Sequence, residues 1–159
     1  MDTWWIDSPH VLGSENPTTA DLEYHRREGF EVLVSLLREQ EQAPKYDVEY
    51  AKDIGFTRHN IPVKDFHPPT VDQLLEFIRL VEQLTEGTKI VIHCQAGMGR
   101  TGTFAAAYWI AKGMDVGEAI AKIRKARSYA IEIEQEAVLA EFAVRNATRL
   151  KSVDVRDKE

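Results

Sequence analysis

Short apolar runs alternate with amphipathic segments along most of the chain. Phe30 to Leu36, Phe56 to Ile61 and Lys89 to His93 are short and rich in apolar or β-branched residues, which predicts strands. Helices are predicted over residues 21–28, 71–86, 104–110 and 132–150, and two more are predicted to begin after Asp47 and Asp115. Because strands alternate with helices, we expect one α/β domain with a mainly parallel central sheet flanked by helices.

Local signals refine two of these helices. Thr70 and Gln73 have the spacing of a capping box in front of the long helix that begins at Val71. Tyr108 and Trp109 follow the apolar pattern of their helix, so we expect them in the hydrophobic core rather than in a cofactor site.

The composition is that of one globular domain. The chain has 159 residues, of which 43% are hydrophobic and 29% charged, so it can bury a single core. We assign residues 1–150 to a catalytic domain and expect residues 151–159 to be a frayed tail. The net charge of −6 argues against nucleic-acid binding. No apolar run approaches the roughly 20 residues that span a bilayer, so we expect no membrane insertion. The single cysteine fits a reducing compartment, and we expect a cytoplasmic monomer.

Residues 93–102, with the sequence HCQAGMGRTG, carry the strongest chemical signal. They lie between a predicted strand and a predicted helix, so their backbone N–H groups and the helix dipole favour an anion such as phosphate. Cys94 is the candidate nucleophile, because thiols beside cations at helix N-termini ionise readily. Arg100 adds a planar fork for two phosphate oxygens. The alternative is that Cys94 is a small buried hydrophobe, but three glycines and an arginine make a poor core strand.

The other residues of this loop have supporting roles. The expected phosphate-binding residues are Gln95, Ala96, Gly97, Met98, Gly99 and Arg100. The glycines, Gly102 included, are expected to let the backbone approach the anion without Cβ clashes. Thr101 can place a hydroxyl near the sulfur and steady a thiolate leaving group. His93 is expected to orient the loop rather than to carry protons.

At these residues the chain resembles the cysteine-dependent protein tyrosine phosphatase superfamily, whose signature is His-Cys-x5-Arg-Thr. The likeness is greatest to the small atypical dual-specificity phosphatases of the VHZ type. It extends over about residues 8–146 and includes residues 29–36, 61–69 and 119–124. The resemblance implies the fold of these phosphatases and a cysteine nucleophile. We expect no cofactor and no metal, because Arg100 and the loop amides take the place of a cation.

A second catalytic group is needed because an alkoxide or phenoxide leaves phosphorus slowly unless it is protonated. Asp65 matches the general acid of the resembling family, which lies on a loop upstream of the cysteine. Pro68 and Pro69 stiffen the end of that loop. Asp72 and Glu76 are poorer candidates because they fall on the following helix. The alternative is that Asp65 is a solvated turn residue or a helix cap.

The resemblance also implies a glutamine that aligns the hydrolytic water, and Gln135 is the candidate. Residues 127–130 read Arg-Ser-Tyr-Ala where relatives often have Arg-Pro-Gly-Ser, so the geometry of this loop is open. The alternative is that Gln135 is an ordinary surface residue of the last helix.

Together these residues predict a metal-independent phosphatase whose partner is a phosphorylated protein or peptide. We expect hydrolysis of phosphotyrosine through a cysteinyl-phosphate, with phosphoserine and phosphothreonine as further candidate substrates. A phosphoinositide or inositol-polyphosphate phosphatase is the first alternative, although Gln95 and Met98 stand where lipid-type relatives often carry lysine. An inactive phosphate-binding module is the second, although Cys94, Asp65 and Arg100 are all present.

Overall fold

A five-stranded sheet forms the centre of the computed structural model, which describes residues 1–158 and the side chains of residues 1–152. The strands are β1 (Thr3–Asp7), β2 (Val11–Ser14), β3 (Phe30–Ser35), β4 (Thr57–Asn60) and β5 (Lys89–His93), in the spatial order β1-β2-β5-β3-β4. Only β1 pairs in the antiparallel sense, with β2, and the other neighbours are parallel. The predicted fold class, one α/β domain with a mainly parallel sheet, is confirmed.

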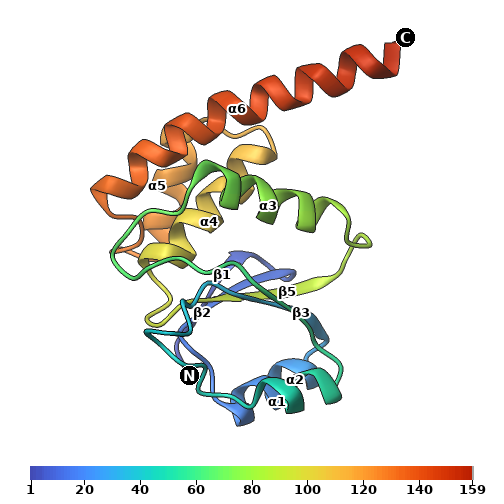
Figure 1. Ribbon diagram of the computed structural model, residues 1–159, viewed down its shortest axis with the longest axis vertical. Helices are drawn as coiled ribbons and strands as arrows, with labels where there is room; N and C mark the ends of the chain where they lie inside the picture. The colour runs from blue at the N-terminus through green and yellow to red at the C-terminus, as the bar shows by residue number, and fades with distance from the viewer. Residues whose placement is uncertain (159) are drawn as a thin grey trace.

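Helices cover both faces of the sheet (Figure 1). The smaller layer holds α1 (Thr19–Arg27) and α2 (Val48–Asp53), and the larger holds α3 (Val71–Glu82), α4 (Gly99–Ala111), α5 (Val116–Ala126) and α6 (Ile133–Lys158). Two clusters of buried side chains correspond to these layers, one under α1 and α2 and a larger one under the other four helices. Among the described residues, no helix is both long enough and apolar enough to cross a membrane.

Most predicted elements are present with small shifts at their ends. The capping box of Thr70 and Gln73 is formed at the start of α3, and Asp47 caps α2. Asp115 caps α5 by accepting from the N–H of Gly117. Tyr108 is buried and Trp109 half-buried, as expected of core residues.

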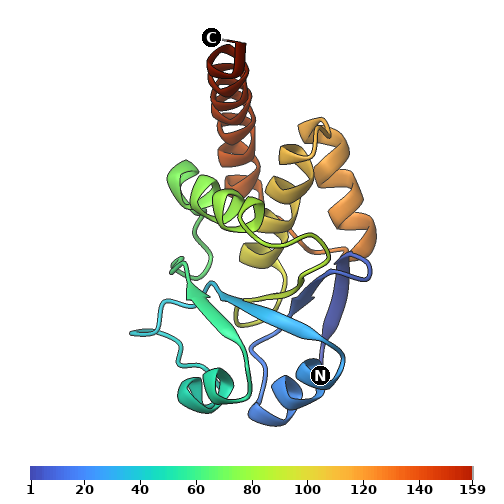
Figure 2. The same ribbon diagram turned by 90° about the vertical axis from the view of Figure 1, so that its right-hand side faces the viewer.

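The last helix was expected to end near residue 150, but α6 continues to Lys158. No glycine or proline follows Leu150 to end the helix. Figures 1 and 2 show this last part of α6 extending beyond the rest of the domain.

The N-terminal hairpin of β1 and β2 was not predicted. Its signal is the alternation of buried Trp4 and Ile6 with exposed Trp5. Gly13 weakens the pattern of β2, but a Cβ there would lie 2.7 Å from the Trp4 ring. Because Gly13 has no side chain, it leaves room for the indole of Trp4 to pack against it.

The parallel strands end together at one edge of the sheet. Ser14, His93, Ser35 and Asn60, the last residues of β2, β5, β3 and β4, are paired in register across the four strands. The segments that follow these strands therefore begin side by side, although they come from distant parts of the sequence. Ligand sites in α/β sheets form at this carboxyl edge.

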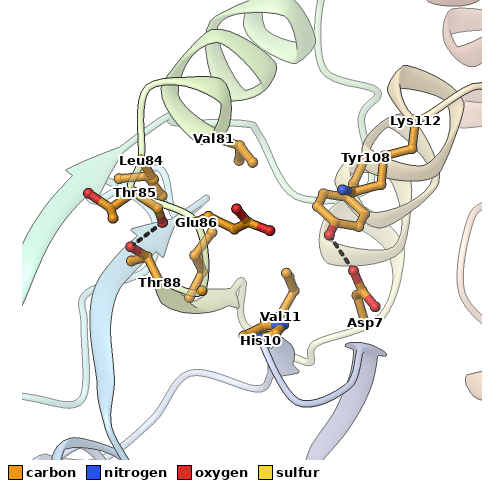
Figure 3. Close-up of a pocket in the computed structure, with 12 residues that line it drawn as sticks. Asp7, His10, Val11, Val81, Leu84, Thr85, Glu86, Thr88, Tyr108 and Lys112 are labelled. Atoms are coloured by element: carbon orange, nitrogen blue, oxygen red, sulfur yellow. Dashed lines mark hydrogen bonds between the residues drawn. The ribbon is translucent and has the colours of Figure 1, made fainter.

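A separate hollow of about 270 Å³ lies at the opposite, amino end of β5 (Figure 3). Its wall includes Glu86, Lys112 and the hydroxyl of Tyr108, which donates a hydrogen bond to Asp7. None of the predicted site residues lines this hollow. The hydrogen bond from Tyr108 joins α4 to β1, and the indole N–H of Trp109 adds a second link to the carbonyl of Ile6 at 3.1 Å.

Trp4 connects the hairpin to the loop after β5. Its indole Nε1–H donates to the backbone carbonyl of Gly97 at 2.8 Å, and the side chain is 7% exposed. A buried carbonyl without a donor is costly, so this bond fixes the orientation of the peptide that follows Gly97.

We predict that Trp4→Phe lowers the free energy of unfolding by about 1–3 kcal/mol, because it leaves the Gly97 carbonyl buried without its donor. Urea denaturation measures this loss. Trp5→Phe is the matched control, since Trp5 is 44% exposed, and its effect should stay within about 0.5 kcal/mol. Equal losses in the two variants would contradict the role given to the Trp4 hydrogen bond.

Candidate active site

The sulfur of Cys94 lies at the junction of β5 and α4. It accepts hydrogen bonds from the backbone N–H of Gly97 at 3.2 Å and from the hydroxyl of Thr101 at 3.1 Å. The helix α4 begins at Gly99, so the positive end of its dipole also faces this region. The placement predicted for Thr101 is thus observed.

Gly97 is the loop residue whose conformation only glycine tolerates easily. Its φ is 73°, in the left-handed region, and a Cβ there would lie 2.7 Å from the backbone of Ser14 and Glu15. The loop therefore packs directly against the end of β2. Gly102 has a different role from the one expected, because it lies within α4, where a Cβ would meet Ala130 at 2.7 Å.

Arg100 is buried, and its guanidinium contacts the segments after β3 and β4. Nη1 donates to the carbonyl of Val63 at 2.9 Å, and Nη2 donates to Oε1 of Gln42 at 2.8 Å. The same Nη2 lies 3.3 Å from Oδ1 of Asp65, which makes an ion pair. Arginine has five N–H donors, so donors remain for substrate oxygens.

Asp65 reaches the site from the turn after β4. Its Oδ2 accepts from Nε2 of Gln42 at 2.7 Å, and its Oδ1 accepts from the N–H of Phe66 at 3.0 Å. Phe66 has a φ of 62°, a strained value for a residue with a side chain, and it turns the chain sharply beside the carboxylate. Asp72, by contrast, lies on α3 and pairs with Arg145 on α6.

A cleft of about 410 Å³ joins these groups. Its wall is formed by Asp65, Phe66, Cys94, Gln95, Ala96, Met98, Gly99, Arg100, Tyr129, Glu132 and Gln135. The structure therefore brings together nearly all the predicted site residues. Gly97, Thr101 and His93 are the exceptions, and they lie beneath the cleft as supports of Cys94.

Gln135 closes one side of the cleft and is only 1% exposed. It is therefore not a surface residue of α6. Its Oε1 accepts from the N–H of Glu132 at 2.7 Å, and its Nε2 lies 3.3 Å from the place that a Cβ on Gly99 would occupy. Gly99 thus leaves room for the glutamine at the start of α4.

The segment before Gln135 is positioned by a basic residue of α5. Arg124 donates to the carbonyl of Ile131 at 2.7 Å and pairs with Glu136 at 2.6 Å. Arg127 pairs with Asp2, which lowers the pKa of that carboxyl group. These contacts set the loop geometry that the sequence left open.

His93 belongs to a buried polar chain below the loop. Its Nε2 lies 2.9 Å from the hydroxyl of Tyr46, and that oxygen also accepts from Nε of Arg58 at 2.9 Å. Nδ1 lies 3.3 Å from the carbonyl of Cys94, and a carbonyl only accepts, so the ring proton is assigned to Nδ1 and Nε2 accepts from the hydroxyl of Tyr46. Burial lowers the pKa of His93 to about 3, so the buried ring is neutral.

Four of the residues that hold this site were not predicted: Trp4, Asn16, Gln42 and Tyr46. Asn16 donates to the side chain of Gln95 at 3.1 Å, and its N–H donates to the carbonyl of Gln95 at 3.0 Å. None of the four unpredicted residues belongs to a recognisable sequence motif. Asn16 and Gln42 lie on loops that begin at the carboxyl edge of the sheet, which is the signal that could have found those two.

Comparison with known proteins places this geometry in a family. A family model described as "Polymorphic toxin system, DSP-PTPase phosphatase" matches residues 10–114, well over half of the chain. The chain belongs to this DSP-PTPase phosphatase family. Its members are protein tyrosine or dual-specificity phosphatases, so the chain carries a domain of the cysteine-based tyrosine phosphatase superfamily.

Curated relatives share the domain but are much longer. Protein tyrosine phosphatase domain-containing protein 1 of Bos taurus is 27% identical over 80% of this chain and 18% of its own length. Tyrosine-protein phosphatase cdc-14 of Caenorhabditis elegans is 30% identical over 75% of this chain and 16% of its own length. The chain thus spans less than a fifth of these DSP-PTPase relatives.

Solved structures match the DSP-PTPase domain over nearly its whole length. Tk-PTP in its active form is 34% identical with a TM-score of 0.81, covering 90% of this chain and 97% of that one. PTPMT1 in complex with PI(5)P is 25% identical with a TM-score of 0.83, covering 93% and 98%. Both likenesses agree with the fold described above.

We predict that His93 stays neutral, with its proton on Nδ1, from pH 8 down to pH 4. Its folded pKa lies below the usual value near 6.5, so the unfolded chain binds this proton first as pH falls. The free energy of unfolding should therefore decline below pH 6.5, by about 1.4 kcal/mol per pH unit for one fully linked proton. His25, whose pKa burial also lowers, acts in the same direction.

Long-range ¹H–¹⁵N spectra of the imidazole rings report the tautomer, and urea denaturation at several pH values reports the stability. Tyr46→Phe is the comparison variant, because it removes the hydroxyl that hydrogen-bonds Nε2 of His93. An imidazolium spectrum of His93 at pH 5 would contradict the assignment.

Proposed function

We propose that this chain hydrolyses phosphotyrosine in proteins or peptides, with phosphoserine and phosphothreonine as further substrates, through a cysteinyl-phosphate. In the first step the Cys94 sulfur forms a bond to phosphorus while the bond to the leaving oxygen breaks, and Asp65 protonates that oxygen. In the second step water attacks phosphorus, Asp65 accepts its proton, and the sulfur leaves as a thiolate. Arg100 and the loop amides bind the other phosphate oxygens in both steps.

The observation that carries this proposal is the environment of the sulfur. Two hydrogen-bond donors, the Gly97 N–H and the Thr101 hydroxyl, lie within 3.2 Å of it, and the buried Arg100 lines the same cleft. Donors of this kind favour a thiolate both as the attacking group and as the group that departs. Since a guanidinium and a helix N-terminus supply the positive charge, the proposed reaction needs no metal.

Gln135 is the proposed positioner of the attacking water. Its side chain lies in the wall of the cleft with Cys94, and its Oε1 is fixed by the backbone of Glu132. An amide in this place can direct a water at phosphorus once the leaving group has gone.

Two aromatic side chains at the cleft support a preference for phosphotyrosine. Phe66 is 74% exposed and Tyr129 is 84% exposed, and both line the cleft that holds Cys94. Exposed rings beside an anion site offer stacking surfaces for a phenyl ring. Phenoxide is also the better leaving group.

A phosphoinositide phosphatase is the second candidate, because the similar PTPMT1 structure holds PI(5)P. The charge of the cleft argues against a substrate that carries several phosphates. Arg100 is its single cation among the described residues, whereas Asp65 and Glu132 are carboxylates. One arginine suits one phosphate, and a second phosphate would meet these acids.

We predict that phosphate from a labelled phosphotyrosine peptide becomes bound to Cys94 during turnover. Gln135→Ala should increase the trapped fraction several-fold, because hydrolysis of the intermediate slows while its formation does not. Rapid quench followed by mass spectrometry of the peptide that contains Cys94, the only cysteine, measures this. Cys94→Ser should trap none and still bind substrate. Turnover without any label on Cys94 would contradict the mechanism, and binding without turnover would indicate an inactive phosphate-binding module.

We predict that kcat/KM for a phosphotyrosine peptide exceeds that for PI(5)P in mixed vesicles by at least about tenfold, the ratio that 1.4 kcal/mol of differential binding gives. The double variant Phe66→Ala and Tyr129→Ala should narrow the gap by lowering the peptide value alone. Both assays run in EDTA, which should leave the rates unchanged. Faster hydrolysis of the lipid would favour the second candidate.

A further inference from the structure

Gln42 joins two groups of the proposed mechanism: Arg100, which binds phosphate oxygens, and Asp65, which protonates the leaving oxygen. Its Oε1 accepts from Nη2 of Arg100 at 2.8 Å, and its Nε2 donates to Oδ2 of Asp65 at 2.7 Å. Arginine only donates and a carboxylate only accepts, so the amide can face these partners in one orientation alone. The side chain of Gln42 thus makes hydrogen bonds to the guanidinium of Arg100, in the loop that follows β5, and to the carboxylate of Asp65, in the turn that follows β4.

The segment that carries Gln42 is itself fixed. Residues 36–47 connect β3 to α2 along the carboxyl edge of the sheet. The N–H of Gln42 donates to the carbonyl of Arg38 at 3.0 Å, and Asn16 donates to the carbonyl of the next residue, Ala43, at 3.0 Å. Glu39 is paired with Arg58 at 2.7 Å. Gln42 therefore projects from an anchored loop rather than from a free one.

Asp65 has fewer constraints of its own. Its side chain is 32% exposed, and it lies in a turn whose next residue, Phe66, is strained and exposed. Its direct contact with Arg100, at 3.3 Å, is longer than its hydrogen bond to Gln42, at 2.7 Å. Of the two side chains that hold the Asp65 carboxylate close to the Cys94 loop, Gln42 therefore makes the shorter contact.

We propose that Gln42 is a positioning residue that holds Asp65 where it can protonate the leaving oxygen, using Arg100 as the other end of the link. The inference rests on the proposed function, since it assigns a partner to the general acid. A hydrogen bond that fixes the carboxyl group of a general acid acts on the step in which that group transfers its proton. It has little effect on substrates whose leaving group departs without a proton.

The test compares kcat and KM for phenyl phosphate, a poor leaving group, and for 4-nitrophenyl phosphate, a good one. Gln42→Ala should lower kcat for phenyl phosphate by about tenfold to a hundredfold, the range expected for a charged hydrogen bond. It should lower kcat for 4-nitrophenyl phosphate by less than about threefold and leave both KM values nearly unchanged. Asp65→Asn should show the same substrate dependence with a larger loss, about 10²–10⁴-fold for phenyl phosphate.

The double variant Asp65→Asn and Gln42→Ala should match Asp65→Asn within about twofold, because a residue that acts through Asp65 adds nothing once the acid is gone. Gln42→Glu keeps an acceptor for Arg100 but loses the donor to Asp65, so it should not restore the phenyl phosphate rate. Gln40→Ala is the matched control, since Gln40 is an exposed residue of the same loop, and it should behave as wild type. Urea denaturation of each variant confirms that it is folded.

The outcomes separate the two proposals. Unchanged kinetics in Asp65→Asn would overturn the proposed general acid and this inference together. The expected loss in Asp65→Asn with wild-type kinetics in Gln42→Ala would overturn the role of Gln42 alone. A raised KM with unchanged kcat in Gln42→Ala, or full activity in Gln42→Glu, would also overturn it, because either result means that Gln42 serves Arg100 and not Asp65.

Discussion

The N–H of Gly97 points at the Cys94 sulfur, and contacts from both strands of the N-terminal hairpin hold that residue in place. Its left-handed φ and the backbone of β2 leave no room for a side chain. On its other side, the carbonyl of Gly97 is bound by Trp4 from the N-terminal strand. A hydrogen bond that stabilises a thiolate is effective only if its donor is already oriented, because reorientation would cost free energy at each turnover. The packing around Gly97 meets this condition before substrate arrives.

The parallel register of the sheet does the same for the rest of the site. It starts four segments at one edge, and each contributes a different side chain: Cys94 after β5, Asp65 after β4, Gln42 after β3 and Asn16 after β2. The contacts among Asp65, Gln42 and Arg100 tie three of these segments together. The chemistry is thus assembled by loops, while the strands determine which loops can meet.

Sequence alone predicted the sheet strands β3 to β5, the helices and most of the residues that meet at the cleft, because these follow from periodicity and from one dense motif. It missed the β1–β2 hairpin, where Gly13 interrupts the strand pattern and where two adjacent tryptophans face opposite ways. The partners of Gln42 and Tyr46 were beyond reach for a different reason. Their roles depend on contacts across long stretches of chain, from Gln42 to Arg100 and from Tyr46 to His93, and a single sequence carries no record of such pairings.

The contact between the Trp4 indole and Gly97 also determines which residues must be included with the candidate site. The segment shared with the family covers residues 10–114, so it omits Trp4 on one side and Gln135 on the other. A fragment cut to those borders would retain the thiol, the guanidinium and the carboxylic acid. It would lose Trp4, which donates a hydrogen bond to the carbonyl of Gly97, and Gln135, whose amide lines the cleft. The unit that holds the candidate site is therefore larger than the segment matched by the family model, and an affinity tag or fusion placed directly before Trp4 would be attached to the strand that contacts the Cys94 loop.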